Sequence, residues 1–303
     1  MCSYVAMCLK KILSLFTILL SPTMNHFQLY RDVCKECSQL VTNRYSTSFS
    51  TGIKVFDKRL RLPICGIYGF VRFADEIVDT FHNYDKALLL QRFREETYRA
   101  IEERISLNPI LQAFQEVVHE YQIERELIDA FLDSMAMDLD FTQYHDLLYK
   151  QYIYGSAEVV GLMCLRVFTE GDDAEYQRLR ASACALGSAF QKINFLRDMK
   201  SDYDERGRVY YPGIDFRNFD NEQKQLIEAD IKADFDKGYE GIMNLPKSAR
   251  FGVYLAYVYY INLFEKIKKS NAKRVQEERI RVSDRRKVYL LFSSALRSSF
   301  NML

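Results

Sequence analysis

The sequence contains no tryptophan, five prolines and twelve glycines among its 303 residues. Strand-rich folds use glycine and proline in their many turns, so the shortage of both favours an all-α fold. The charges are balanced, with 42 basic and 41 acidic residues and a formal net charge of +1. A protein that binds nucleic acid needs a surplus of lysine and arginine on one face, so this balance argues against such a partner.

The seven cysteines form no recognisable framework. Their odd number and irregular spacing argue against structural disulfides and predict reduced thiols in a cytoplasmic protein. Cys34 and Cys37 form a CxxC pair, but no second pair follows and the four histidines are dispersed. A zinc site is therefore not expected, and the pair is interpreted as two thiols on one helix face.

Near its start the chain carries an apolar run, within KKILSLFTILLSP, that follows a basic pair. The run is far shorter than the roughly 20 apolar residues that a spanning helix needs, and it resembles a short signal peptide or an interfacial segment. Met24 follows directly. We expect residues 1–23 to lie outside the fold, as an extension or a weak membrane-contact segment, and residues 24–303 to form one domain.

Helical periodicity dominates the rest of the chain, with apolar residues at i and i+3 or i+4. Pro63 is well placed early in a helix, which predicts a loop over 46–63 and then a helix to about Phe81. Gly155 and Gly161 interrupt an apolar helical run and indicate close backbone packing or a bend beside a cavity. The predicted helices cover 29–45, 63–81, 84–105, 109–121, 124–141, 146–168, 174–205, 221–245, 250–270 and 285–300. No repeat or long polar linker divides them, so we predict a single all-α domain.

Two pairs of aspartates stand four residues apart inside apolar runs. Asp75 and Asp79 lie in FADEIVDTF, and Asp198 and Asp202 lie in FLRDMKSD. Residues four apart share one face of a helix, so the members of each pair point the same way. The polar residues that share these faces are Arg72, Gln191 and Asn194. Acids at this spacing are common on solvated helix faces, but these two helices are apolar rather than laced with charge.

Buried carboxylates repel one another and persist where a cation compensates them. Carboxylate and amide oxygens are hard ligands suited to Mg²⁺, which commonly bridges to phosphate. We call the face with Asp75 and Asp79 the first acidic stripe and the face with Asp198 and Asp202 the second acidic stripe. If the two stripes face each other, they predict a Mg²⁺ cluster that binds a diphosphate, with Arg72 and Arg197 on the remaining phosphate oxygens.

The rest of such a cavity is expected to be apolar and aromatic. The chain has 21 tyrosines and 21 phenylalanines, whose rings can line a hydrocarbon pocket and stabilise carbocations. Ordinary core packing is the alternative for each ring. The candidate lining rings are Phe49, Tyr68, Phe70, Phe73, Tyr152, Tyr154, Phe190, Tyr257, Tyr259 and Tyr260.

At these residues the sequence resembles the phytoene/squalene synthase family of head-to-head prenyl transferases. The two acidic motifs of the family appear as YGFVRFADEIVD (68–79) and AFQKINFLRDMKSDYDERGRVYYP (189–212). Further matches are RYSTSFS (44–50), YIYGSAEVVG (152–161) and YYINLFEKI…RVSDRRKV. The resemblance covers about residues 27–290. It implies an all-α isoprenoid synthase fold around a central cavity, with residues 24–303 as the catalytic domain.

The resemblance also implies roles for individual residues. The expected metal and diphosphate ligands are Asp75, Asp79, Asn194, Asp198 and Asp202. A loop that grips a diphosphate matches Tyr45, Ser46, Thr47 and Ser48. Positions lining the substrate site match Tyr68, Arg72, Gln191, Arg197 and Tyr259. The expected catalytic set is Arg72 with the four aspartates, and the expected metal is Mg²⁺, with Mn²⁺ as a substitute.

Some positions depart from the family pattern. Thr47 stands where some relatives carry a basic residue, which puts phosphate contact there in doubt. Ser156 and Glu158 replace small apolar residues or glycine, with an effect on pocket depth or on local packing. Lys192 lies between matched positions, and its spacing predicts that it points away from the acidic stripe.

The resemblance is strongest to bacterial phytoene synthases, which implies condensation of two geranylgeranyl diphosphates to phytoene through a cyclopropylcarbinyl diphosphate. NADPH is not expected for that product. Formation of squalene or dehydrosqualene from farnesyl diphosphate is the alternative within the family. A non-catalytic assembly protein would be expected to lose motif acids. A class I terpene cyclase would be expected to lack the serine loop and the RGRVYYP segment.

Oily substrates imply contact with a membrane surface. The predicted C-terminal helix is basic and could contribute, although a solvated face is an equal interpretation. Its basic residues are Arg285, Arg286, Lys287 and Arg297. The sequence makes no prediction of oligomeric state.

Overall fold

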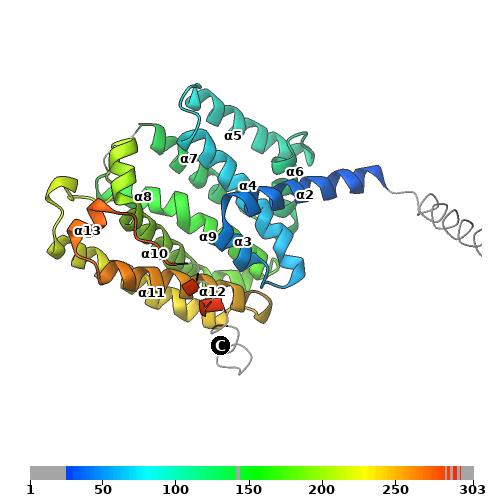
Figure 1. The fold of residues 1–303 in the computed structure, drawn as a ribbon. Helices are drawn as coiled ribbons and strands as arrows, with labels where there is room; N and C mark the ends of the chain where they lie inside the picture. Colours follow the sequence, from blue (N-terminus) through cyan, green and yellow to red (C-terminus); the bar gives the residue numbers. More distant parts are fainter. Residues whose placement is uncertain (1–24, 141–143, 284, 287–288, 292–293, 295–303) are drawn as a thin grey trace, which may run out of the picture.

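The computed structural model describes residues 25–140, 144–283, 285–286, 289–291 and 294, without the side chains of Thr47, Ser48 and Arg206. The chain folds into helices joined by short loops (Figure 1). The α-helices are α2 (His26–Tyr45), α3 (Thr47–Ile53), α4 (Lys58–Asp79), α5 (Lys86–Glu103), α6 (Pro109–Tyr121), α7 (Arg125–Asp140), α8 (Asp146–Ile153), α9 (Val159–Phe168), α10 (Asp173–Arg206), α11 (Asn221–Asn244), α12 (Lys247–Lys268) and α13 (Ala272–Glu277). A π-turn, η1 (Tyr154–Glu158), and a 3₁₀ turn, η2 (Phe216–Asn218), complete them. The all-α prediction is confirmed for these residues, while residues 1–23, Lys287 and Arg297 lie outside them.

The predicted loop over 46–63 is wrong, because it holds α3 and the first part of α4. Ser46 begins α3 by accepting a hydrogen bond from the Phe49 main-chain N–H. Asp57 caps α4 in the same way, through the N–H of Arg59. Side-chain oxygens at these positions satisfy N–H groups that have no partner inside the helix. Pro63 therefore lies inside α4 rather than at its start.

The predicted helix over 146–168 is interrupted at η1, where five residues widen into a π-turn. A side-chain carbon on Gly155 would lie 2.4 Å from the main-chain oxygen of Ala130 on α7. One on Gly161 would lie 3.2 Å from the main-chain oxygen of Ala183 on α10. The close backbone packing that these two glycines predicted is confirmed, because a methyl group at either site would press on a rigid neighbouring backbone.

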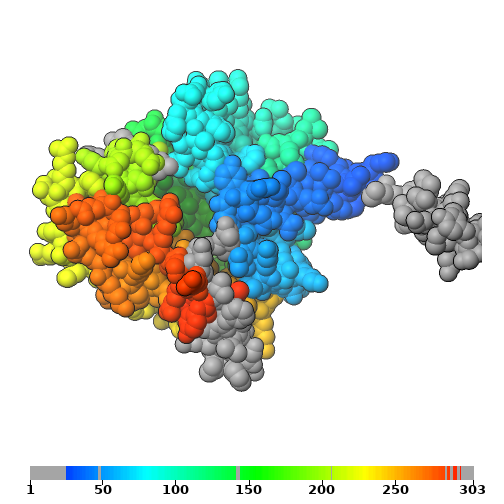
Figure 2. Space-filling model, in the orientation of Figure 1, coloured from blue at the N-terminus to red at the C-terminus, as the bar shows by residue number. Residues whose placement is uncertain are grey.

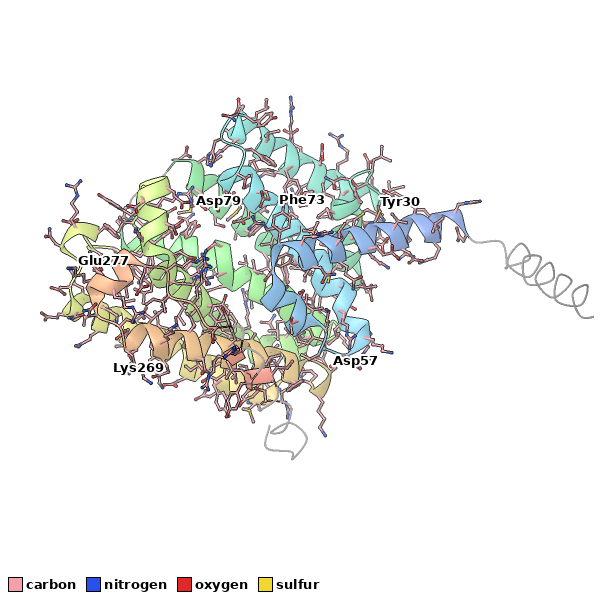
Figure 3. All side chains as sticks on the ribbon, viewed as in Figure 1. Tyr30, Asp57, Phe73, Asp79, Lys269 and Glu277 are labelled. Carbon is pink, nitrogen blue, oxygen red and sulfur yellow. The ribbon has the colours of Figure 1, made fainter. Side chains whose placement is uncertain are left out.

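Two buried apolar clusters make up the core. The first joins α4, α5, α6, α7 and α9, and at its centre the ring of Phe70 stacks on Phe114 with centroids 3.9 Å apart. The second joins α8, α10, α11, α12 and α13 around residues such as Ile193 and Phe235. Long α10 packs against helices of both clusters. Figure 3 shows Asp57 and Asp79 at opposite ends of α4, and the Asp79 end lies within 3.5 Å of Arg208 on the loop after α10.

Candidate active site

The first acidic stripe gathers residues from α2, α4 and the α2–α3 junction. Arg72 Nη1 lies 2.5 Å from Asp75 Oδ2, and the same guanidinium also pairs with Glu76. The guanidinium carbon of Arg72 lies 4.5 Å from the centre of the Tyr45 ring. The Tyr68 hydroxyl is hydrogen-bonded to the side chain of Ser46. Tyr45, Ser46, Tyr68, Arg72 and Asp75, which the sequence predicted as one site, therefore lie together. Thr47 and Ser48 follow them, but their side chains are outside the described part of the chain.

The second stripe lies on α10. Arg197 Nε lies 3.0 Å from Asp198 Oδ1, and Arg279 Nε, from the segment after α13, lies 2.7 Å from the same oxygen. Asn194 Oδ1 accepts a long hydrogen bond of 3.4 Å from the Tyr260 hydroxyl on α12. Asp202, one turn further along α10, is buried. The stripe therefore faces protein on several sides rather than bulk solvent.

Buried tyrosines lie beside both stripes. Burial raises the pKa of Tyr68, while the nearby Arg72 acts to lower it and Asp75 and Tyr260 act to raise it. Burial likewise raises the pKa of Tyr260, which also feels the charges of Arg197 and Asp198. Tyr68 thus lies beside the first stripe, and Tyr260 on α12 contacts the second through its hydrogen bond to Asn194.

The remaining predicted residues fall on or beside the second stripe. Tyr259 packs edge-on against Tyr260, with centroids 5.4 Å apart, and interacts electrostatically with Arg197. Gln191 is half-buried on the same face of α10. Lys192 points away, as predicted, and its ammonium lies 2.5 Å from Asp230 and 2.7 Å from Asp234 on α11.

Ser156 and Glu158, the two residues of η1 that depart from the family pattern, have different surroundings. Glu158 forms a side-chain hydrogen bond with Cys184 on α10, and burial raises the pKa of this carboxyl. The Ser156 hydroxyl is buried. Glu158 thus takes part in local packing between η1 and α10.

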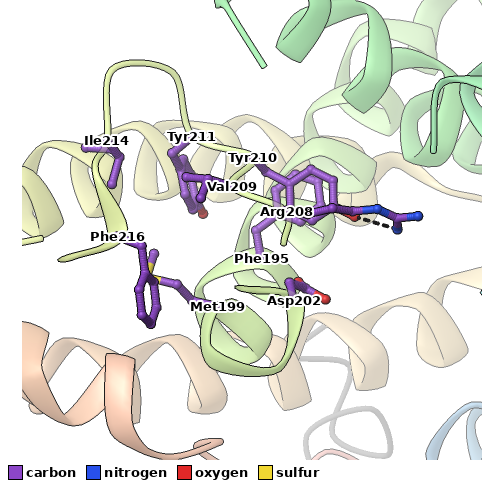
Figure 4. A pocket seen from close by; sticks show the side chains of 9 residues that line it. All are labelled: Phe195, Met199, Asp202, Arg208, Val209, Tyr210, Tyr211, Ile214 and Phe216. Atoms are coloured by element: carbon purple, nitrogen blue, oxygen red, sulfur yellow. Dashed lines mark hydrogen bonds between the residues drawn. The ribbon is translucent and has the colours of Figure 1, made fainter. Parts of the chain in front are cut away.

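A buried polar cluster beside Asp79 was missed by the sequence reasoning, and Figure 4 shows two of its members, Arg208 and Tyr210. Arg208, on the loop after α10, lies 3.5 Å from Asp79 and 3.4 Å from Asp138. Its Nη1 also donates to the Tyr210 hydroxyl at 3.3 Å. Burial raises the pKa of Asp138 to about 6, against the lowering effect of Arg208 and of a hydrogen bond from Tyr152. The available signal was an acid inside the apolar run SMAMDLDF, the same pattern that revealed Asp75 and Asp79.

Hollows at the surface and within the fold adjoin the site. Figure 2 shows the surface hollowed between the blue α3–α4 region and the orange C-terminal region, with green segments at its floor. A cavity of about 430 Å³ lies between α4 and α5 beside the first stripe. Its lining residues are Tyr45, Phe73, Glu76, Ile77, Phe81, Leu89, Arg92, Phe93 and Glu96. A water-sized pocket at the end of α10 includes Asp202, Arg208 and Tyr210 in its lining.

Comparison with known protein families matches residues 42–286 to squalene/phytoene synthase. The chain belongs to this family. Its members are head-to-head prenyl transferases, as the sequence motifs predicted. The match includes both acidic stripes and Arg279.

Individual curated relatives of this family member share about a quarter to a third of its residues in the matched regions. The phytoene synthase of Pseudescherichia vulneris is 34% identical over 169 residues, which are 52% of this chain and 53% of the relative. The 15-cis-phytoene synthase of Pantoea ananas is 32% identical over 179 residues, 55% of this chain and 56% of the relative. The chain thus spans about half the length of these curated relatives. The phytoene synthase of Cereibacter sphaeroides is 26% identical over 299 residues, 89% of this chain and 80% of the relative.

Solved structures share the fold. A dehydrosqualene synthase in complex with a ligand has a TM-score of 0.77 at 21% identity, covering 91% of this chain and 99% of that one. Squalene synthase HpnC from Alicyclobacillus acidocaldarius has a TM-score of 0.70 at 20% identity, covering 82% of this chain and 97% of that one. The isoprenoid synthase fold predicted from the motifs is therefore confirmed.

The family implies a divalent metal, and the donor set fits one. Asp75 with Asp79 on one helix and Asp198 with Asp202 on the other supply hard oxygen donors at the spacing of one helical turn. Among the described residues, no three histidine, cysteine, aspartate or glutamate side chains are grouped closely enough to hold an ion. Two carboxylates with substrate phosphate oxygens are a usual coordination for Mg²⁺, so each aspartate pair suits an ion that arrives with a diphosphate.

In the segments that the structure describes, no helix combines the length and apolar character needed to cross a bilayer.

Proposed function

We propose that the chain condenses two geranylgeranyl diphosphates head to head to phytoene, through a cyclopropylcarbinyl diphosphate and with release of diphosphate. The observation that supports the proposal is the pair of acidic stripes, each with guanidinium groups at its aspartates: Arg72 beside Asp75 on α4, and Arg197 and Arg279 beside Asp198 on α10. The names of the relatives from Pseudescherichia vulneris and Pantoea ananas support phytoene as the product.

Each residue group has a distinct task in this reaction. The guanidinium groups of Arg72, Arg197 and Arg279 lie within the two stripes and balance negative charge on a departing diphosphate. Bound Mg²⁺ would supply Lewis-acid stabilisation of the same leaving group. The aspartates would hold that ion, and the arginines now paired with them could turn to phosphate oxygens.

The chemistry proceeds by two ionisations. Loss of the first diphosphate leaves an allylic cation, the double bond of the second substrate attacks it, and loss of a proton closes the cyclopropane ring. Loss of the second diphosphate starts a rearrangement that ends with loss of another proton. Aromatic rings such as Phe190 and Tyr260, stacked with centroids 4.0 Å apart, can stabilise the passing cations. This series of reaction steps ends in loss of a proton rather than addition of a hydride, so phytoene formation needs no NADPH.

Farnesyl diphosphate is the second candidate substrate. A 4,4'-diapophytoene synthase of Staphylococcus haemolyticus is 26% identical over 205 residues, 65% of this chain and 68% of the relative. The same site would then yield a C30 product, with NADPH required for squalene but not for dehydrosqualene.

The test is to incubate the purified full chain with Mg²⁺ and either geranylgeranyl or farnesyl diphosphate, with and without NADPH. Chromatography is expected to show a C40 hydrocarbon from the C20 substrate without NADPH. A C30 hydrocarbon alone would select the farnesyl reaction. A cyclic product from one substrate molecule, or intact substrate throughout, would overturn head-to-head condensation.

We further propose that residues 24–303 form the catalytic domain and that the protein works at a membrane surface, because its proposed product is insoluble in water. Removal of residues 1–23 should leave turnover unchanged. The protein should sediment together with anionic lipid vesicles at low salt. A protein that stays in the supernatant would contradict membrane contact.

A further inference from the structure

Arg208 occupies a fixed place between α4, α7 and the end of α10. Its Nη2 donates to the main-chain oxygen of Asp138 at 2.7 Å. Its Nη1 lies 3.4 Å from Asp138 Oδ1 and 3.5 Å from Asp79 Oδ1. The Arg208 side chain is buried, so bulk water cannot readily solvate the guanidinium if one of its carboxylate partners is lost.

Asp138 is held as firmly as the arginine it contacts. Tyr152 donates to its Oδ2 at 2.7 Å, and Tyr144 donates to its Oδ1 at 3.2 Å. The rings of Tyr144, Tyr152 and Tyr210 pack on one another with centroids 5.0 to 5.3 Å apart. Each carboxylate oxygen of Asp138 therefore has its own hydrogen-bond donor, and the donors belong to rings that are packed together.

The two carboxylates beside Arg208, Asp138 and Asp79, differ in their surroundings. Asp138 lies in the protein interior, whereas Asp79 belongs to the first acidic stripe and has a partly exposed side chain, at 24%. Arg208 Nη1 lies 3.4 Å from Asp138 Oδ1 and 3.5 Å from Asp79 Oδ1, so Asp138 takes a share of the positive charge that would otherwise act on Asp79 alone. If the charge of Asp138 were lost, Arg208 would pair with Asp79 alone and would compete more strongly with a divalent ion there.

We propose that Asp138 is a positioning residue that anchors Arg208 and thereby keeps Asp79 available to a divalent cation and its diphosphate. The inference rests on the proposed function, since it assigns Asp79 to metal binding. Asp138 touches neither substrate nor metal and acts through Arg208. Residues behind a metal ligand commonly change metal affinity by ten- to a hundredfold, and a change of that order is expected here.

The experiment measures binding rather than turnover. Mn²⁺ is titrated into the full chain with inorganic diphosphate present, and free Mn²⁺ is followed by electron paramagnetic resonance. Asp138→Asn keeps the side-chain shape and removes the charge, and it is expected to weaken Mn²⁺ binding by roughly ten- to a hundredfold. Asp133→Asn, an exposed acid on the same helix, is the matched control and should bind as the wild type does.

A double-mutant cycle tests the route through Arg208. In the Arg208→Gln background, Asp138→Asn is expected to cause no further loss of Mn²⁺ affinity, because the competing cation is already gone. A full additional loss in that background would overturn the inference, as would wild-type affinity in Asp138→Asn alone.

Failure of the proposed function can be distinguished from failure of the inference about Asp138. If wild-type protein binds no Mn²⁺ with diphosphate, the proposed metal-dependent function fails, whereas wild-type binding that Asp138→Asn leaves unchanged defeats this inference alone. If Asp138→Asn does not fold, Tyr152→Phe removes one hydrogen bond from Asp138 and should weaken binding several-fold. Unchanged binding in a folded Tyr152→Phe protein would then count against the anchor.

Discussion

Arg279 Nε lies 2.7 Å from Asp198 Oδ1, although the two residues are 81 positions apart in the chain. The contact brings the segment after α13 onto the second acidic stripe. Asp198 also pairs with Arg197, so two guanidinium groups meet at one carboxylate. A cation in this place can bind a diphosphate once a metal ion takes over the aspartate.

Arg279→Gln should therefore raise KM for the prenyl diphosphate by about tenfold, with a smaller effect on kcat. The reason is that a charge-assisted hydrogen bond to phosphate is lost in the bound and transition states alike. Steady-state kinetics on both variants gives the measurement. Arg274→Gln, which breaks an exposed pair between α13 and Glu278 at its C-terminal end, is the control and should leave KM unchanged. Equal KM values for the Arg279 variant and the wild type would remove Arg279 from the site.

Local pattern predicted most helices, and it missed what depends on distant contacts. Apolar spacing was enough for the apolar faces of α4 and α10, and helical geometry was enough to align each aspartate pair. The short α3 was missed because its sequence, TSFSTGI, is rich in residues typical of loops. The contact between Arg208 and Asp138 joins positions 70 apart, and no spacing rule specifies it. Sequence thus revealed each stripe, whereas their relative position depends on how α12 and the loop after α10 pack.

The packing at Gly155 makes a sharp stability prediction. Gly155→Ala should lower the free energy of unfolding by about 1–3 kcal/mol, because its new methyl group would meet the main-chain oxygen of Ala130 at 2.4 Å. Gly52→Ala in α3 is the matched control, since no atom lies within 4 Å of a side chain built there. That substitution should be neutral or stabilising by up to about 1 kcal/mol. Urea unfolding followed by circular dichroism distinguishes the two, and equal midpoints would contradict the packing.

Glu116 on α6 predicts a pH-dependent contribution to stability. Burial acts to raise its pKa, but hydrogen bonds from Arg31, Gln112 and Lys35 outweigh burial and lower the pKa below its usual value. An acid with a lowered folded-state pKa stabilises the fold above its unfolded pKa of about 4.3, and this contribution is lost as pH falls through the folded value.

Glu116→Gln should then lower the free energy of unfolding at pH 7 by about 1.5–3 kcal/mol. The difference from wild type should shrink as the pH falls below about 4. Urea titrations at pH 7, 5 and 3.5 test the trend, with Glu36→Gln on the exposed side of α2 as the control. A difference that stays constant across this range would show that Glu116 contributes by shape rather than by charge.

Asp198→Asn should separate chemistry from folding. The substitution removes one charge from a half-buried carboxylate that contacts Arg197 and Arg279, and both arginines can still reach solvent or substrate. The fold should therefore persist, with a thermal midpoint within a few degrees of wild type. Turnover should fall by on the order of a hundred- to a thousandfold, because the stripe loses a proposed metal ligand and with it stabilisation of the departing diphosphate. Glu205→Gln, an exposed acid near the end of the same helix, is the control and should keep full activity. Wild-type turnover in a folded Asp198→Asn protein would show that the second stripe does not serve the reaction.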